Sequence, residues 1–146
     1  MKLRTLCGIA LFAYASSPLL AQEPRVYSEG AVSVVTTVNV HDGQLESYMG
    51  YLSKTFKPDM EAQKKAGNVL AYAVYTTRAR TPDDPDLYLV VTYTNMAAFD
   101  GIDDREEAVS QKVSGESRAQ ADLSFIARGK MREIMGSEVI REVVLK

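Results

Sequence analysis

Apolar residues recur along the chain with two different periods, which predict where strands and helices lie. Residues 31–40 (AVSVVTTVNV) are rich in β-branched side chains, as is typical of a strand. From Gln44 apolar residues recur every three or four positions, which predicts a helix that ends at Gly67. Pro58 interrupts this pattern and is expected to kink or break the helix near Lys57, because proline has no N–H for a helix interior.

The remaining pattern predicts two more strands, a long helical region and a final strand. Residues 68–79 and 87–95 are apolar, β-rich and separated by a loop rich in proline and aspartate. The helical stretch from about residue 105 to 135 would span ~45 Å as one helix, longer than strands of ~30 Å can cover. We therefore expect a break near Gly115, and a last strand over residues 137–146.

The element order β-α-β-β-α-β predicts an α+β, ferredoxin-like fold: a four-stranded antiparallel sheet with both helices on one face. The strands are nevertheless apolar on both sides. In the second strand Ala73 and Tyr75 alternate with Tyr72 and Val74, although a sheet with one solvated face normally alternates apolar and polar residues. The helices can cover only one of these faces.

A second copy of the chain, packing sheet against sheet, is the cover that we expect for the other face. If the open face is on the order of 1,000 Å², covering it gains roughly 25 kcal/mol gross, more than an association cost of ~4–15 kcal/mol. The sequence therefore predicts a homodimer through the sheet face. Folding of the N-terminal leader and loops over that face is the alternative.

The first residues, MKLRTLCGIALFAYASSPLLAQEP, combine two basic residues with a short apolar run and a small residue before Gln22. This pattern is typical of a secretory signal peptide. We expect a signal peptide at residues 1–21, a polar leader at 22–30 and one domain at 31–146, in the periplasm or secreted. A retained N-terminal anchor is the alternative, but the run is interrupted and shorter than the ~20 residues that a bilayer needs.

Removal of this segment changes the charge and the cysteine content. Lys2, Arg4 and the single Cys7 would leave with it, so that 15 basic and 19 acidic residues remain. A mildly acidic chain lacks the basic surface that binds nucleic acid or anionic membranes, so neither is expected as a partner. Without cysteine the mature chain has no disulfide and no thiol nucleophile.

Three stretches resemble one known family: VNVHDGQLESYMGYL, FKPDMEAQKKAGNVLAYAVY and DLYLVVTY. Over residues 31–146 the chain is similar to the dimeric α/β-barrel superfamily, which includes cofactor-independent antibiotic-biosynthesis monooxygenases, and especially to a secreted, uncharacterised bacterial branch. The resemblance implies paired sheets and a pocket between the sheet and the helices of each subunit. It does not select a function, because the superfamily contains oxygenases, isomerases, haem proteins and members with no known activity.

His41, the only histidine, is the catalytic candidate. A histidine with a pKa of about 6.5 can act as a general base. Its neighbour Asp42 would not normally face it, so the pair is no dyad by spacing alone. The alternative is a polar residue between strand and helix, with Asp42 or Gly43 capping the helix.

Four strand tyrosines and one arginine are the ligand-binding candidates: Tyr72, Tyr75, Tyr88, Tyr93 and Arg78. Buried tyrosines need a partner for the hydroxyl, and several together can orient a phenolic or quinone-like ligand. The arginine can bind a carboxylate. Ordinary sheet and interface packing, and a salt bridge within the loop, are the alternatives.

The sequence predicts no metal and no cofactor, since DGIDDREE (100–107) lacks EF-hand spacing and no nucleotide-binding or zinc motif occurs. Two functional hypotheses remain. The first is a homodimeric binder of a small, largely apolar or aromatic ligand. The alternative is a cofactor-independent monooxygenase or isomerase that acts on an aromatic or quinone-like substrate. The scarcity of titratable residues at expected buried positions favours the binder slightly and leaves open whether the protein is an enzyme.

Overall fold

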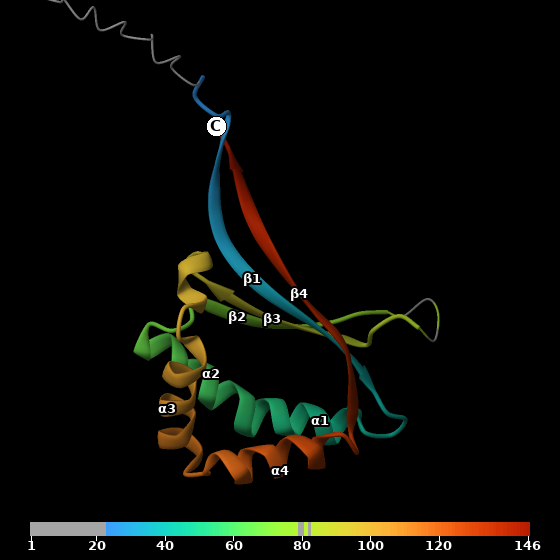
Figure 1. Ribbon diagram of the computed structural model, residues 1–146. Helices are drawn as coiled ribbons and strands as arrows, with labels where there is room; N and C mark the ends of the chain where they lie inside the picture. The colour runs from blue at the N-terminus through green and yellow to red at the C-terminus, as the bar shows by residue number, and fades with distance from the viewer. Residues whose placement is uncertain (1–22, 79–80, 82) are drawn as a thin grey trace, which may run out of the picture.

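A computed structural model describes residues 23–78, 81 and 83–146, so the expected signal peptide (1–21) lies outside the described residues. The elements are β1 (Tyr27–Val40), α1 (Leu45–Tyr51), the π-helix η1 (Leu52–Phe56), α2 (Lys57–Ala66), β2 (Ala71–Thr76), β3 (Leu87–Tyr93), the 3₁₀-helix η2 (Met96–Phe99), α3 (Ile102–Ser114), α4 (Arg118–Arg128) and β4 (Arg132–Leu145). The strands pair in the order β2-β3-β1-β4, all antiparallel. The helices lie on one side of this sheet (Figure 1), which is the predicted α+β ferredoxin-like fold.

The core lies where the first helix meets the middle of the sheet. Val38 of β1 and Leu87 of β3 are directly opposite each other and almost fully buried. Tyr48 and Leu52 of the helix pack against them. The apolar positions that the sequence spaces three or four apart are therefore the ones that close this core.

Pro58 does not break the first helix. The chain stays helical from Leu45 to Ala66 and takes up the proline with the π-helix η1, in which the Lys57 N–H donates to the Leu52 carbonyl five residues back. A wider turn of this kind suits a position where proline cannot supply the usual helical N–H. Gly67 ends the helix as predicted, in the left-handed region with φ +80°.

The start of the helix differs from the expected cap. Its N-cap is Gln44, without a side-chain hydrogen bond, rather than Asp42 or Gly43. A backbone turn precedes it, in which the Gln44 N–H donates to the His41 carbonyl (2.9 Å) and Gly43 has φ +74°. The helix therefore starts from a backbone turn instead of from the capping side chain that was expected.

The second helical region breaks at Gly115 as predicted but ends earlier than predicted. Gly115 has φ +71°, and α4 stops at Arg128 instead of continuing to residue 135. β4 begins at Arg132, where it pairs with Val40, and Ile134 pairs with Val38. The apolar residues here have the spacing of a helix, but they form a strand because their backbone groups can hydrogen-bond to β1.

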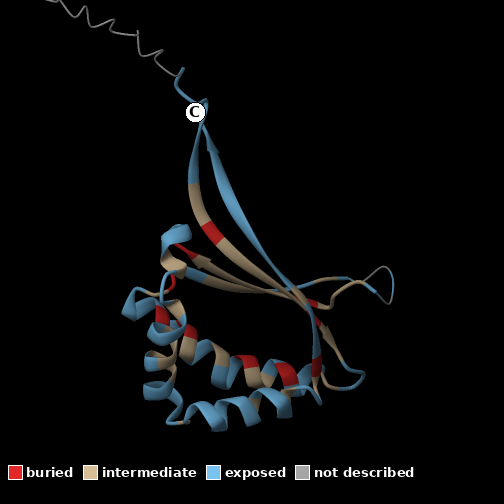
Figure 2. Cartoon of the chain, viewed as in Figure 1, coloured by how far each residue is buried: buried red, intermediate tan, exposed pale blue. Residues whose placement is uncertain are grey.

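The sheet is also longer at one end than expected. β1 begins at Tyr27, inside the stretch expected to be a leader, and pairs with β4 up to Leu145. We call residues 27–31 of β1 and 139–145 of β4 the β1–β4 arm. Figure 1 shows that the arm projects beyond the helices, and Figure 2 shows it mostly exposed. Five of its apolar residues are 45–80% exposed: Val139, Ile140, Val143, Val144 and Leu145.

Candidate functional site

The four candidate tyrosines do not converge on one site. Tyr75 is directly opposite Tyr88 on the open face of the sheet, and Tyr75 is 56% exposed. Tyr72 and Tyr93 lie on the helix face, where each phenol donates to a glutamate. Four tyrosines that the sequence groups together therefore form two pairs on opposite faces, and their role in ligand binding stays a prediction.

The two tyrosines of the helix face have their hydroxyl groups satisfied within the chain. The Tyr72 hydroxyl donates to Glu61 (2.6 Å), and the Tyr93 hydroxyl to Glu106 (3.1 Å). The hydrogen bond to Glu61 raises the pKa of Tyr72, and burial next to Glu106 raises the pKa of Tyr93. Both phenols are therefore held protonated and act as hydrogen-bond donors rather than as bases.

His41 is exposed at the end of β1 and is tied to the turn between α4 and β4. Its Nε2 lies 3.1 Å from the Gly129 carbonyl oxygen, and its backbone N–H donates to the Met131 carbonyl (3.0 Å). It lines a small cleft of about 270 Å³ together with Asp86. These contacts join two chain segments, and a catalytic role for His41 stays a prediction. Arg78 is exposed beyond the end of β2.

A larger cleft lies between helices. It has a volume of about 440 Å³ and is bordered by the first helix on one side and by α3 and α4 on the other. Its apolar lining includes Tyr51, Phe56 and Val113, and Arg128 is among its charged residues. We call this the helical cleft. The family resemblance implied a pocket between sheet and helices, whereas this cleft is lined by helices and by the connection between α3 and α4.

A buried polar network fixes the two helices that form one end of the cleft. Gln63 of α2 is 1% exposed, and its Nε2 donates to the Glu106 carbonyl (2.9 Å) and to the Ser110 hydroxyl (3.1 Å) of α3. Its Oε1 accepts from Asn68 (2.8 Å), and the Ser110 hydroxyl donates to Asp59 (2.8 Å). Ser110 and Asp59 line the cleft, so the network sets the shape of its wall.

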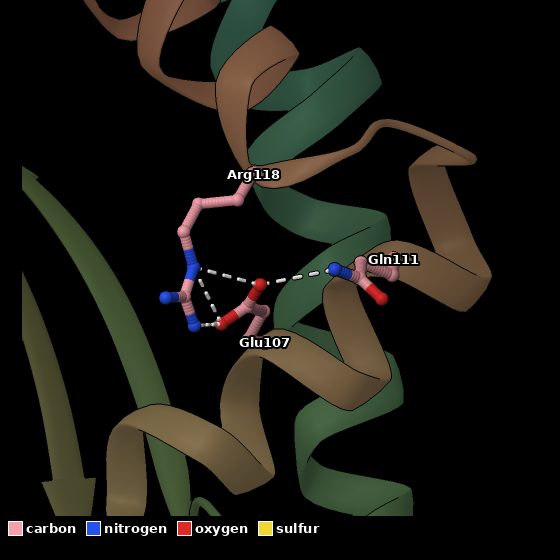
Figure 3. A network of polar contacts seen from close by, with 3 residues as sticks. All are labelled: Glu107, Gln111 and Arg118. Carbon is pink, nitrogen blue, oxygen red and sulfur yellow. Dashed lines mark hydrogen bonds and ion pairs between the residues drawn. The ribbon is translucent and has the colours of Figure 1, made fainter.

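An exposed ion pair fixes α4 relative to α3 after the break at Gly115. The guanidinium of Arg118 donates to both carboxylate oxygens of Glu107, which also accepts from Gln111 at 3.0 Å (Figure 3). These hydrogen bonds lower the pKa of Glu107. The Ser117 hydroxyl and the Gln120 side chain form a capping box at the start of α4. Together these contacts set the direction in which α4 leaves α3.

Two arginines and three aromatic rings form a cluster beside the cleft. Tyr48 and Tyr51 stack at 5.9 Å between ring centroids. The Arg128 guanidinium lies 4.9 Å from the Tyr51 ring and 5.4 Å from the Phe125 ring, and that of Arg132 lies 5.2 Å from Phe125 and 5.9 Å from Tyr48. We call these five residues the arginine–aromatic cluster. Tyr51 and Arg128 belong both to the cluster and to the cleft lining.

The members of this cluster differ in how far their side chains are buried. Tyr48 is 1% and Arg132 is 8% exposed, whereas Phe125 is 51% exposed. Burial raises the pKa of Tyr48, and the charge and hydrogen bonding of Arg132 oppose that rise. The cluster could not be expected from the sequence, because Arg132 lies in the stretch predicted to be helical, up to about residue 135, whereas it begins β4. One local pattern in the sequence points to the cluster: Arg128 and Arg132 follow shortly after Phe125.

Within residues 23–78, 81 and 83–146, no three His, Cys, Asp or Glu side chains are grouped so that they could hold a metal ion. In the same residues no helix has the length and apolar character to cross a membrane.

Comparison with known proteins finds similarity to solved structures. No protein family and no curated protein matches the sequence. HapK from Hahella chejuensis is 17% identical with a TM-score of 0.48, over 76% of this chain and 91% of that protein. A dimeric ferredoxin-like protein from an uncultured marine organism is 13% identical, with a TM-score of 0.49, over 82% and 98%.

An antibiotic biosynthesis monooxygenase-like protein from Caulobacter crescentus CB15 is 21% identical, with a TM-score of 0.36, over 82% of this chain and 92% of that protein. The proteins found thus include dimeric ferredoxin-like proteins and an antibiotic biosynthesis monooxygenase-like protein, as the sequence resemblance led us to expect. By its own strand order and helix placement, the chain has the ferredoxin-like fold.

Proposed function

We propose that this protein is a homodimer that binds a small, largely apolar or aromatic ligand in the helical cleft. The observation that carries the proposal is the cleft itself. Its volume of about 440 Å³ falls in the range of ~300–1,000 Å³ that is typical of small-molecule sites. Tyr51 and Phe56 offer ring surfaces for stacking, and Arg128 offers a polar group that can orient the ligand.

The β1–β4 arm supports the homodimer. The outer part of the arm, where residues 27–29 pair with residues 143–145, is a two-stranded ribbon, which is marginally stable on its own. Its apolar residues Val143, Val144 and Leu145 are 45–80% exposed. Because side chains alternate between faces, Ile140 and Val144 extend the open face that carries Tyr75 and Tyr88. A second copy that covers this combined surface would bury the arm and the sheet together.

Sedimentation or light scattering at micromolar concentration tests the dimer. The wild-type chain is expected at twice its own mass, and Ile140→Asp, which places a charge in the proposed interface, is expected to weaken association at least tenfold. Leu45→Asp is the matched control, since Leu45 is similarly exposed (49% against 48%) but begins α1. A monomeric wild-type protein under these conditions would refute the proposed dimer.

Fluorescence of the neutral, apolar probe N-phenyl-1-naphthylamine tests the cleft. Saturable binding is expected, with at least a tenfold loss in Ala121→Trp, because Ala121 lines the cleft and the larger side chain would fill it. Ala119→Trp, at an exposed position of α4 outside the lining, is the control and is expected to bind as wild type. Equal binding of the probe by both variants would show that the helical cleft is not its binding site. Conversion of a bound aromatic compound to an oxygenated or isomerised product would favour the enzymatic alternative.

The proposed location outside the cytoplasm depends on the predicted signal peptide. We expect the protein in the periplasmic fraction or the medium, shortened by about 21 residues. N-terminal sequencing of the mature chain measures this directly. A full-length chain that stays with the cytoplasm would contradict this part of the proposal.

A further inference from the structure

Arg132 is a buried cation without a carboxylate partner among the described residues. Its side chain begins β4, is 8% exposed, and forms neither of the two ion pairs found in that part of the chain. No atom of residues 23–78, 81 or 83–146 forms a hydrogen bond with its Nε. Its guanidinium contacts the Tyr48 and Phe125 rings, and both are neutral.

These neutral contacts compensate only part of the cost of burying the charge. Arginine is almost never buried this far unless it is paired with an anion, because removing a charge from water is expensive. Contact with an aromatic face recovers a smaller amount. Arg128 lies against the same Phe125 ring and adds a second positive charge, so the cluster is a site of positive potential to which the described part of the chain supplies no ion-paired carboxylate.

The chemistry of the cluster indicates which anion fits. A guanidinium is a planar fork of donors that matches the two oxygens of a carboxylate. The rings of Tyr51 and Phe125, which are less buried than that of Tyr48, present flat surfaces suited to an aromatic group. Two carboxylates line the helical cleft, Asp59, which accepts from Ser110 (2.8 Å), and Glu116, which accepts from Ser124 (3.0 Å). Among the described residues neither forms an ion pair with Arg128 or Arg132.

We infer that the arginine–aromatic cluster is a binding site for the carboxylate of an aromatic acid whose ring occupies the helical cleft. The inference rests on the proposed function and specifies its ligand as an anion. Continuity supports it, because Tyr51 and Arg128 line the cleft and also contact the rest of the cluster. Arg132 would pair with the carboxylate, and Arg128, which lines the cleft, would add a second positive charge.

Titration of the wild-type protein with 1-naphthoate and with its neutral counterpart 1-naphthamide tests the inference directly. Both compounds offer the same ring system, so the difference in affinity measures the recognition of the charge. Calorimetry is expected to give at least tenfold tighter binding of the naphthoate. The Hε resonance of Arg132 is expected to shift when naphthoate is added, because the free Nε–H gains an acceptor. Equal affinities for the two compounds would overturn the inference.

Arg132→Met removes the charge and keeps much of the length of the side chain. It is expected to weaken naphthoate binding at least tenfold and to leave naphthamide binding nearly unchanged. The melting temperature of the unliganded variant is expected to equal or exceed that of the wild type, since an apolar side chain replaces an uncompensated charge. Lys130→Met, which makes the same change of charge at an exposed neighbour, is the control and should bind naphthoate as wild type.

The outcomes separate this inference from the proposed function. Binding of the neutral probe and of naphthamide in the cleft, without a preference for naphthoate, leaves the proposed function standing and overturns the carboxylate site. Failure of all three compounds to bind overturns both. An Arg132→Met variant that keeps naphthoate affinity but loses its dimeric state would also overturn the carboxylate site, because the partner of Arg132 would then belong to the second copy.

Discussion

Replacing Gln63 by leucine would break the polar network that joins α2 to α3. The wild-type amide uses both its nitrogen and its oxygen: it donates to the Glu106 carbonyl and the Ser110 hydroxyl, and it accepts from Asn68. Leucine has a similar volume and a high helix propensity, so the substitution removes hydrogen bonds without opening a large cavity. Asn68 would lose the partner that the structure gives its side-chain nitrogen.

The expected loss of stability follows from these three contacts. Each buried hydrogen bond contributes about 1 kcal/mol net, which gives about 3 kcal/mol for the set. The greater burial of apolar surface by leucine offsets about 1 kcal/mol of this. We therefore expect Gln63→Leu to lower the free energy of unfolding by about 2 kcal/mol, and also to weaken binding in the helical cleft, because Ser110 lines it.

Urea unfolding measures this change, with the protein concentration held constant because association contributes to apparent stability. Gln111→Leu is the matched control: Gln111 is an exposed glutamine of α3 that makes one side-chain hydrogen bond, to Glu107. It is expected to change the free energy of unfolding by less than about 0.5 kcal/mol. If the two variants lost the same stability, the assignment of the Gln63 network as a structural support of the cleft would be wrong.

Burial raises the pKa of Glu106 above its ordinary value of 4.5, so the folded state binds the carboxyl proton more tightly than the unfolded state does. The free energy of unfolding therefore falls as the pH rises from 4.5 through the raised pKa. Glu106→Gln, which keeps an acceptor for the Tyr93 hydroxyl, is expected to remove this fall when unfolding is compared at about pH 4 to 7; parallel pH profiles would contradict the assignment. Gly67→Ala, at φ +80°, is expected to destabilise the protein by about 1 kcal/mol. Gly50→Ala lies in α1, where an added Cβ meets free space, and is expected to stabilise the protein by about 0.5–1 kcal/mol. Thermal melts in which Gly67→Ala and Gly50→Ala shifted the melting temperature in the same direction would refute this backbone argument.

The order of the elements could be predicted from the sequence because each signal is local. The change of period at Gln44 and the glycines at 67 and 115 act on the backbone within a few residues of themselves. Alternation along single strands also showed that Tyr72 and Tyr75 face opposite ways. Sequence patterns therefore determined the fold class, the break at Gly115 and the presence of apolar residues on both sides of the sheet.

The tertiary structure alone decided how these pieces meet. The end of α4 at Arg128 depends on strand pairing with β1, about ninety residues away, and no local pattern contains that register. The partners of the buried polar groups are similarly distant: Gln63 bonds a carbonyl 43 residues later in the chain. The position of Arg132 beside Tyr48 and Phe125 arises in the same way. Local backbone preferences set the elements, but burial and long-range hydrogen bonding decide which side chains share a site.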